Sequence, residues 1–213
     1  MTGAHARFDA IRAACPLIAI LRGVTTAEID DVAAVLIEAG IGLIEVPLNS
    51  PDAFRTIERL AAIAGDRAVI GAGTVLSAAD AQRVRDAGGT LMVAPNSDPT
   101  VIAAGVAAGL VAIPGYMTPT EAFAALAAGA HALKLFPAEG ATPAVLRAQR
   151  AVLPPGVPVF VVGGASAATM PGWQAAGADG FGIGSALYRP GKPLDRIAAD
   201  AAALVAGVRA LNG

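Results

Sequence analysis

The chain has 213 residues, a formal net charge of −2 and one cysteine, and 55% of its residues are hydrophobic against 15% that are charged. It contains no basic cluster and no apolar run near the roughly 20 residues of a membrane span, so we expect neither nucleic-acid nor membrane partners. One cysteine excludes an internal disulfide, and the two histidines beside it are too few for a His/Cys metal cluster. We therefore expect a cytoplasmic protein without a metal or another cofactor.

The chain begins with a predicted short amphipathic helix at residues 5–14, which Cys15-Pro16 ends. From there one pattern recurs about every 20–27 residues: a short apolar strand, a turn, an alanine-rich helix and a glycine. The predicted strands are residues 17–21, 43–46, 68–72, 90–93, 110–113, 132–136, 157–162 and 180–183. Eight such units predict an α/β fold, a single (β/α)8 TIM barrel with a short N-terminal helix.

Small residues mark the ends of the predicted helices. Ala-Gly pairs precede several strands, where a left-handed residue ends a helix, at Gly40, Gly88, Gly109, Gly129 and Gly177. Residues that cap helix N-termini stand at Thr25, Ser77, Asp98, Thr118 and Ser166. No linker divides the chain, so residues 1–213 are expected to form one domain. An open doubly wound sheet is the alternative, but Gly71-Ala72-Gly73 is too short a match to a dinucleotide fingerprint to support it.

Lys134 lies in the middle of an apolar run of strand length and is one of only two lysines, beside thirteen arginines. Strand alternation puts Lys134 on the same face as Ala132 and Phe136. Burial lowers the pKa of a lysine, and a neutral amine beside an apolar pocket attacks ketones to form a Schiff base. The alternative is a lysine whose ammonium reaches solvent at the strand end.

Glu45 is the one acid in the otherwise apolar segment 41–47. In this barrel the chemistry takes place where the strands end, so Glu45 is expected across the mouth from Lys134. There it could move protons during Schiff-base formation, whereas a salt bridge to Arg22 is the structural alternative. The other polar residues at strand ends are Asn49, Thr74, Asn96, Glu139 and Ser185.

Two glycine-rich turns follow the last two predicted strands. They are Val162-Gly163-Gly164-Ala165-Ser166 and Gly182-Ile183-Gly184-Ser185. Glycines let backbone N–H groups approach an anion, and these two loops of the barrel are a frequent phosphate site. The alternative is that the glycines only permit tight turns. Because both loops carry them, we expect a phosphate there.

Several motifs resemble those of the KDPG/KHG aldolase family, class I lyases of 2-keto-3-deoxy sugar acids. They are Glu45-Val46-Pro47-Leu48-Asn49-Ser50, Gly71-Ala72-Gly73-Thr74-Val75, Leu133-Lys134-Leu135-Phe136-Pro137-Ala138, Val162-Gly163-Gly164 and Gly184-Ser185. The gluconate-specific branch has Thr and Arg where this chain has Pro47 and Asn49, and Thr where it has Val162. The resemblance therefore implies the galactonate substrate. It leaves Arg22 and Thr74 as candidates to hold the substrate carboxylate, with binding of the phosphate as the alternative role for Arg22.

What the resemblance implies is reversible cleavage of 2-dehydro-3-deoxy-6-phosphogalactonate to pyruvate and glyceraldehyde 3-phosphate. The gluconate epimer and 4-hydroxy-2-oxoglutarate are the alternative substrates. Lys134 and Glu45 would be catalytic, and a further set would bind the substrate: Arg22, Thr74, Pro95, Phe136, Val162, Gly163, Gly164, Gly184 and Ser185. A homotrimer is expected as well, and the low charged fraction fits surface buried between subunits.

Two other functional classes fit the same barrel. A phosphosugar isomerase or epimerase would use Glu45 as a base and would not need Lys134 as a nucleophile. A non-catalytic phosphosugar-binding protein would use the glycine turns and neither of these side chains. A lysine and a glutamate on opposite strands of one mouth favour the aldolase.

Overall fold

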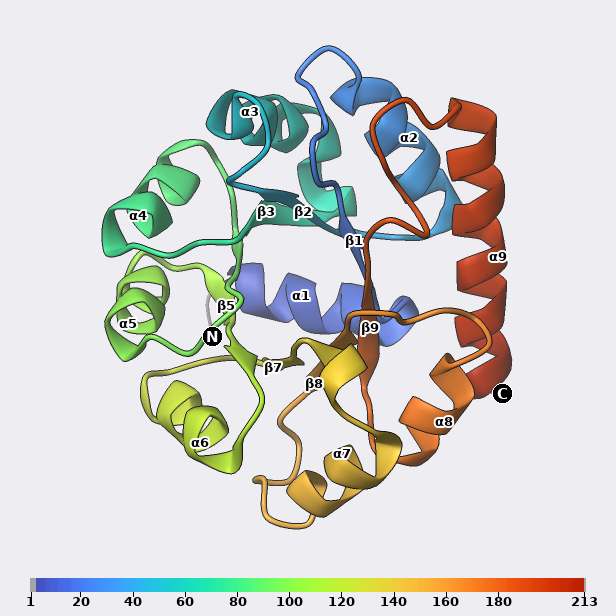
Figure 1. Ribbon diagram of the computed structural model, residues 1–213. Helices are drawn as coiled ribbons and strands as arrows, with labels where there is room; N and C mark the ends of the chain where they lie inside the picture. Colours follow the sequence, from blue (N-terminus) through green and yellow to red (C-terminus); the bar gives the residue numbers. More distant parts are fainter. Residues whose placement is uncertain (1–2, 213) are drawn as a thin grey trace.

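The computed structural model describes residues 3–212, and their strands form a parallel barrel surrounded by helices (Figure 1). Within this range the hydrogen-bonded order is β5-β4-β3-β2-β1-β9-β8-β7-β6. The strands are β1 Leu17–Ile20, β2 Leu43–Pro47, β3 Val69–Gly73, β4 Leu91–Val93, β5 Val111–Ile113, β6 Gly115–Tyr116, β7 Leu133–Leu135, β8 Val159–Val162 and β9 Gly180–Ile183. Each predicted strand is present, and β6 was not predicted but continues the fifth barrel strand beyond β5, so the (β/α)8 barrel is confirmed.

Pro114 divides the fifth barrel strand into β5 and β6; the sequence predicted only its first part, at residues 110–113. β5 pairs with β4, whereas β6 pairs with β7, because a proline has no N–H to continue the ladder. The carbonyl of Pro114 still accepts a hydrogen bond from the Lys134 N–H at 2.9 Å, and that of Ala112 accepts from the His131 N–H at 2.9 Å. These bonds close the ring beside Lys134.

Helices follow the strands around the outside of the barrel. They are α2 Ile29–Ala39, α3 Ala53–Ala64, α4 Ala78–Asp86, α5 Pro99–Ala107, α6 Pro119–Ala127, α7 Pro143–Arg150, α8 Met170–Ala175 and α9 Leu194–Asn212. The 3-10 turns η1 Gly65–Arg67 and η2 Ala138–Gly140 complete the set. None of the helices in the described part of the chain is long and apolar enough to span a membrane.

The predicted N-terminal helix is confirmed as α1, Gly3–Ala14. It lies behind the strands in Figure 1, where it closes the end of the barrel opposite the mouth. Phe8 of α1 is 2% exposed, and its ring centroid lies 6.2 Å from that of Phe160 on β8. One aromatic contact thus joins the helix to the bottom of the barrel core.

Most predicted helix boundaries are confirmed. The five glycines after Ala have φ between 80° and 101°, the left-handed geometry that ends a helix. Ser77, Asp98 and Thr118 each accept a backbone N–H as N-caps. Thr25 and Ser166 do not, because an extra turn precedes α2 and α8, which begin four residues after each of them. Those two predictions were wrong: the Thr25 hydroxyl donates to Glu28, and the Ser166 N–H donates to Thr169.

Because side chains alternate along the strands, the inward-facing residues form a column that runs from the barrel core to its mouth. The inward residues form their own hydrophobic cluster, which includes Leu43 and Ala132. Two positions further along the same strands, the inward residues are Glu45 and Lys134. The period of two therefore places both ionisable groups at the top of an apolar interior.

Candidate active site

Lys134 is buried inside the mouth of the barrel. The residue is 7% exposed, and its Nζ lies 4.5 Å from the centroid of the Phe136 ring. Burial lowers the pKa of Lys134, the nearby Glu45 carboxylate opposes that shift, and the positive charge of Arg22 adds to it. In the described chain its ammonium forms no hydrogen bond or ion pair, so the amine is poised to react.

Glu45 is the acid that faces the same interior. The residue is 2% exposed, and its Oε2 has no hydrogen-bond partner within residues 3–212. Burial raises the pKa of Glu45 to about 7, although the charges of Lys134 and Arg22 hold it down. A carboxyl with a pKa near neutrality can both give and accept a proton, which is what general acid–base chemistry requires.

Gly73 makes room for the Glu45 carboxylate. It ends β3 and pairs with Pro47 of β2, and a Cβ added to it would lie 1.9 Å from Glu45 Oε2. Any side chain here would displace the carboxylate. The sequence showed this glycine only as part of a motif, because which atoms lie over it depends on the pairing of two strands.

Arg22 stands above β1 at the mouth. Its Nη1 donates to Asn49 Oδ1 at 2.8 Å, and both residues are exposed. No ion pair joins Arg22 to Glu45 in the part of the chain that the structure describes, so the salt-bridge alternative for Glu45 is wrong. Arg22 is instead held by a neutral amide, which leaves its positive charge available to an anion.

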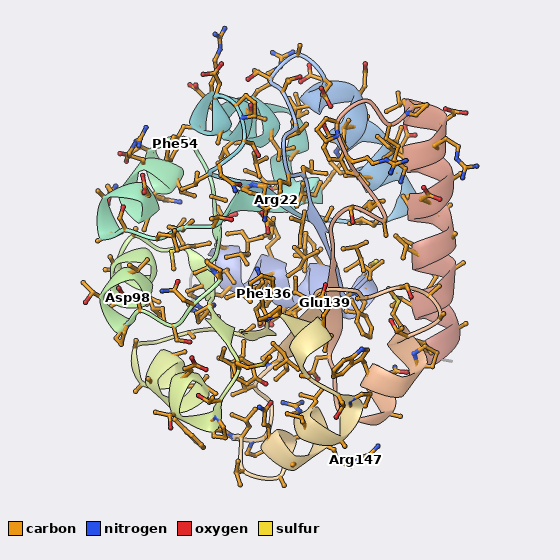
Figure 2. All side chains as sticks on the ribbon, viewed as in Figure 1. Arg22, Phe54, Asp98, Phe136, Glu139 and Arg147 are labelled. Carbon is orange, nitrogen blue, oxygen red and sulfur yellow. The ribbon has the colours of Figure 1, made fainter. Side chains whose placement is uncertain are left out.

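A pocket of about 330 Å³ opens at the barrel mouth. We call it the mouth pocket, and its lining is Ile20, Arg22, Phe136, Glu139, Val162, Gly163, Gly164, Ala165, Ser166, Gly182, Gly184, Ser185 and Ala186. Figure 2 shows Arg22, Phe136 and Glu139 near the barrel centre, whereas Phe54, Asp98 and Arg147 lie among the outer helices. Lys134 and Glu45, which we call the floor pair, are not in this lining but adjoin it: Lys134 lies two residues before the lining residue Phe136, and Glu45 is aligned in the sheet with the lining residue Ile20.

Five residues in or beside the two glycine-rich turns line the mouth pocket and have backbone N–H groups without an acceptor among the described residues. We call these N–H groups the amide rim; they belong to Gly163, Gly164, Ala165, Ser185 and Ala186. Gly163 and Gly164 have φ values of 114° and 63°, which other residues rarely adopt. Unpaired donors on two adjacent turns are suited to an anion with several oxygens.

Glu139 is the acid that lines the mouth pocket. It belongs to η2, is exposed, and lies against the amide rim: a Cβ on Gly163 would be 2.0 Å from Glu139 Oε2. Arg22 and Glu139 are the charged residues of the lining and cancel formally. The sequence placed Glu139 at a strand end but gave no sign that it would meet a glycine of the next strand's turn.

Two predicted residues lie at the mouth but outside the pocket lining. Thr74 follows β3 with φ of 57° and is half-buried, and Pro95 follows β4 and is half-buried too. The carbonyl of Pro95 packs on Gly115, where a Cβ would lie 2.3 Å from it. Among residues 3–212, no three His, Cys, Asp or Glu side chains are gathered as metal ligands would be.

This arrangement joins a buried lysine, a buried acid and several backbone N–H groups without acceptors in the described chain at the end of one barrel. Residues 8–199 match the family model described as KDPG and KHG aldolase. The chain belongs to this aldolase family. Its members are therefore the proteins with which the mouth is best compared.

Two relatives and one solved structure are similar along nearly the whole chain. A probable 2-dehydro-3-deoxy-6-phosphogalactonate aldolase of Rhizobium meliloti is 47% identical over 93% of this chain and 93% of its own. The 2-dehydro-3-deoxy-6-phosphogalactonate aldolase of Escherichia coli is 44% identical over 91% of this chain and 95% of its own. A native KDPGal structure superposes with a TM-score of 0.91 and 43% identity, covering 92% of this chain and 96% of that one.

Proposed function

We propose that this chain is a class I aldolase that cleaves 2-dehydro-3-deoxy-6-phosphogalactonate reversibly to pyruvate and glyceraldehyde 3-phosphate. The observation that carries the proposal is the floor pair: a buried lysine with a lowered pKa and a buried acid with a pKa of about 7. Both adjoin a pocket whose rim offers five free N–H groups. A lysine and an acid of this kind are what imine chemistry needs, and the free N–H groups suit a phosphate.

In the first half of the reaction, the Lys134 amine attacks the ketone carbon of the substrate and forms a carbinolamine. Glu45 supplies the proton with which the hydroxyl leaves as water, and the iminium remains on Nζ. The iminium attracts electrons from the neighbouring carbon, so no metal is required to polarise the carbonyl.

In the second half, the Glu45 carboxylate accepts the proton of the 4-hydroxyl while the bond between carbons 3 and 4 breaks. The electrons of that bond form an enamine, and glyceraldehyde 3-phosphate leaves. Protonation of the enamine and hydrolysis of the imine release pyruvate and free Lys134. Glu45 changes from acid to base between the two halves, which a pKa of about 7 permits.

The two anionic ends of the substrate are assigned to opposite sides of the mouth pocket. Arg22 and Thr74 are assigned to the carboxylate, because the charge of Arg22 already reaches Lys134. The amide rim and the Ser185 hydroxyl receive the phosphate, and Phe136 forms an apolar wall, while Pro95 and Thr74 would meet the substrate beside this lining. Gly182 of β9 and Gly184, just after it, have no side chains that could obstruct the phosphate in the mouth pocket.

The preference for the galactonate epimer is supported by the names of the two relatives and by Val162, which lines the pocket before Gly163. Valine has no hydroxyl to hold one orientation of the 4-hydroxyl, so we expect a preference with measurable turnover of the gluconate epimer. An apolar wall discriminates by only about 1–3 kcal/mol.

A side-by-side assay of the galactonate and gluconate epimers tests this proposal. Turnover of the galactonate epimer should be the faster, and Val162→Thr should shift the ratio toward gluconate by about tenfold. Wild-type preference for the gluconate epimer would overturn the substrate assignment. Turnover of neither epimer would overturn the aldolase itself.

The working form is further proposed to be a cytoplasmic homotrimer. Large apolar side chains remain exposed, including Leu76 at 55%, Phe123 at 44% and Val152 at 57%, which supports burial between subunits. Light scattering on the eluting protein should give three times the chain mass of 21.0 kDa. A single chain mass would contradict it.

A further inference from the structure

The second lysine, Lys192, has no part in the chemistry proposed above, yet it is tightly held. Its side chain is 10% exposed, and its Nζ donates to the Ala186 carbonyl at 2.8 Å and to the Leu187 carbonyl at 2.7 Å. The third contact is an ion pair with Asp200 Oδ2 of α9 at 2.6 Å. An ammonium has three donors, so all of them are used.

Both carbonyls belong to the turn that carries two of the five N–H groups of the amide rim, those of Ser185 and Ala186. In this turn, residues 184–188, the N–H groups of Leu187 and Tyr188 both donate to the Gly184 carbonyl at 2.9 Å. The Gly184 carbonyl shares its peptide group with the N–H of Ser185. That N–H lacks an acceptor within the described chain and lines the mouth pocket.

Two hydrogen-bonded chains therefore run from one ammonium to one N–H. The first passes from Lys192 through the Ala186–Leu187 peptide to the Gly184 carbonyl. The second passes from Lys192 through the Leu187–Tyr188 peptide to the same oxygen. Each bond polarises the next peptide group along such a chain, so the Ser185 N–H at its end becomes a stronger donor.

The charges in the lining of the mouth pocket explain why a stronger donor at the Ser185 N–H would matter for binding an anion. Arg22 and Glu139 cancel in the lining, and Glu139 lies against the rim where an anion would bind. A second cavity of about 370 Å³ shares Ser185 and Ala186 with the mouth pocket and has three cations, Arg189, Lys192 and Arg196, and one anion, Asp200, in its wall. The wall behind the turn is therefore positive on balance, and Lys192 is the cation in it that donates hydrogen bonds to the turn.

We propose that Lys192 is a positioning residue for the phosphate: through the carbonyls of Ala186 and Leu187 it fixes and polarises the turn that presents the Ser185 N–H. The inference rests on the proposed aldolase function and deepens it. Lys192 does not touch substrate. Its effect is confined to the phosphate end of the mouth pocket.

The test compares Lys192→Met, which keeps the length of the side chain without its charge, with Arg196→Met from the same cavity. The pyruvate condensation is assayed with glyceraldehyde 3-phosphate and with unphosphorylated glyceraldehyde, and inorganic phosphate is titrated calorimetrically. Lys192→Met should raise the KM for the phosphorylated aldehyde and the Kd for phosphate about tenfold, with kcat nearly unchanged. Arg196→Met should change both by less than about twofold, because it removes charge without a bond to the turn.

Equal losses on both aldehydes, or equal effects of the two variants, would overturn the proposal. Should Lys192→Met fold poorly, Asp200→Asn keeps the lysine but loosens it, and a smaller rise confined to the phosphorylated aldehyde is expected. A loss shared by both aldehydes in that variant would also overturn it. The phosphate titration needs no turnover, so it distinguishes failure of this inference from failure of the aldolase proposal.

Discussion

The floor pair and the amide rim lie within one mouth but are built by different physical means. At the floor, two ionisable side chains are buried with their reactive atoms unpaired, and burial moves the pKa of each toward neutrality. At the rim, the donors are backbone N–H groups on turns that are only partly exposed. In the proposed function, the chemistry would depend on side chains whose charge is suppressed, and the binding of the phosphate on dipoles that carry no net charge.

The two lysines differ in a similar way, one without a hydrogen-bond partner for its Nζ in the described chain and the other fully hydrogen-bonded. Lys134 has an aromatic ring beside its Nζ and no oxygen bound to it in the described chain, whereas Lys192 has three oxygens around its Nζ. The same side chain is proposed as a nucleophile in one place and is a hydrogen-bonded structural cation in the other. Environment, and not residue type, separates the two roles.

The largest effect is expected from removing the acid of the floor pair. Glu45→Gln keeps the shape of the side chain but cannot move a proton, so kcat should fall by roughly 10²–10⁴. The free energy of unfolding should hold or rise, because the change removes a buried carboxyl whose Oε2 is unpaired. If activity survives while the protein is destabilised, Glu45 is a structural residue.

The same variant also tests the electrostatics of the floor. The pKa of Glu45 is raised from 4.5 to about 7, so the folded chain binds this proton more tightly than the unfolded chain does. The resulting stabilisation is complete below about pH 4.5 and is lost as pH rises through about 7. Denaturant unfolding of wild type and Glu45→Gln across this range should show a pH slope in the difference between them. A flat difference would contradict the raised pKa.

A smaller loss is expected from Gly73→Ala. The new Cβ would occupy the place of the Glu45 carboxylate, 1.9 Å from its Oε2, and would push that group away from Lys134. We expect kcat to fall by on the order of 10–100-fold, since misplaced catalytic groups lose much of their effect. Far-UV circular dichroism checks the fold, and Gly207→Ala in α9 is the matched control, because its Cβ would meet only Ala167 Cβ at an ordinary 3.8 Å. Equal losses in the two variants would show that the position of Glu45 is not the cause.

The smallest effect should have the opposite sign. Glu139→Gln removes the negative charge that lies against the amide rim, so the KM for glyceraldehyde 3-phosphate should fall about threefold, and less at high salt. The KM for unphosphorylated glyceraldehyde should not follow. A rise in KM for the phosphorylated aldehyde would mean that Glu139 supports the turn instead.

The features that depend on neighbouring residues along the chain could be predicted from the sequence. Strand alternation correctly put Lys134 and Glu45 on the inward face, and the Ala-Gly pairs marked helix ends, because both depend on neighbours along the chain. The interruption of the fifth barrel strand at Pro114 could also have been predicted, since a proline at a strand end is a local signal.

Contacts between distant segments could not be predicted in this way. The approach of Glu139 to Gly163 and of Glu45 to Gly73 depends on the register of adjacent strands. The Lys192 bonds depend on how the segment before α9 folds back onto the turn after β9. Thr25 and Ser166 failed as caps because the length of each loop, and not the capping residue, decided where the helix began.

Covalent trapping tests the central claim most directly. Wild-type protein is incubated with pyruvate and borohydride, and the labelled residue is located by mass spectrometry after digestion. The account predicts one reduced pyruvyl group on Lys134, none on Lys192, and no label in folded Lys134→Arg. A label on Lys192, or a folded and active protein that traps no pyruvate, would contradict it.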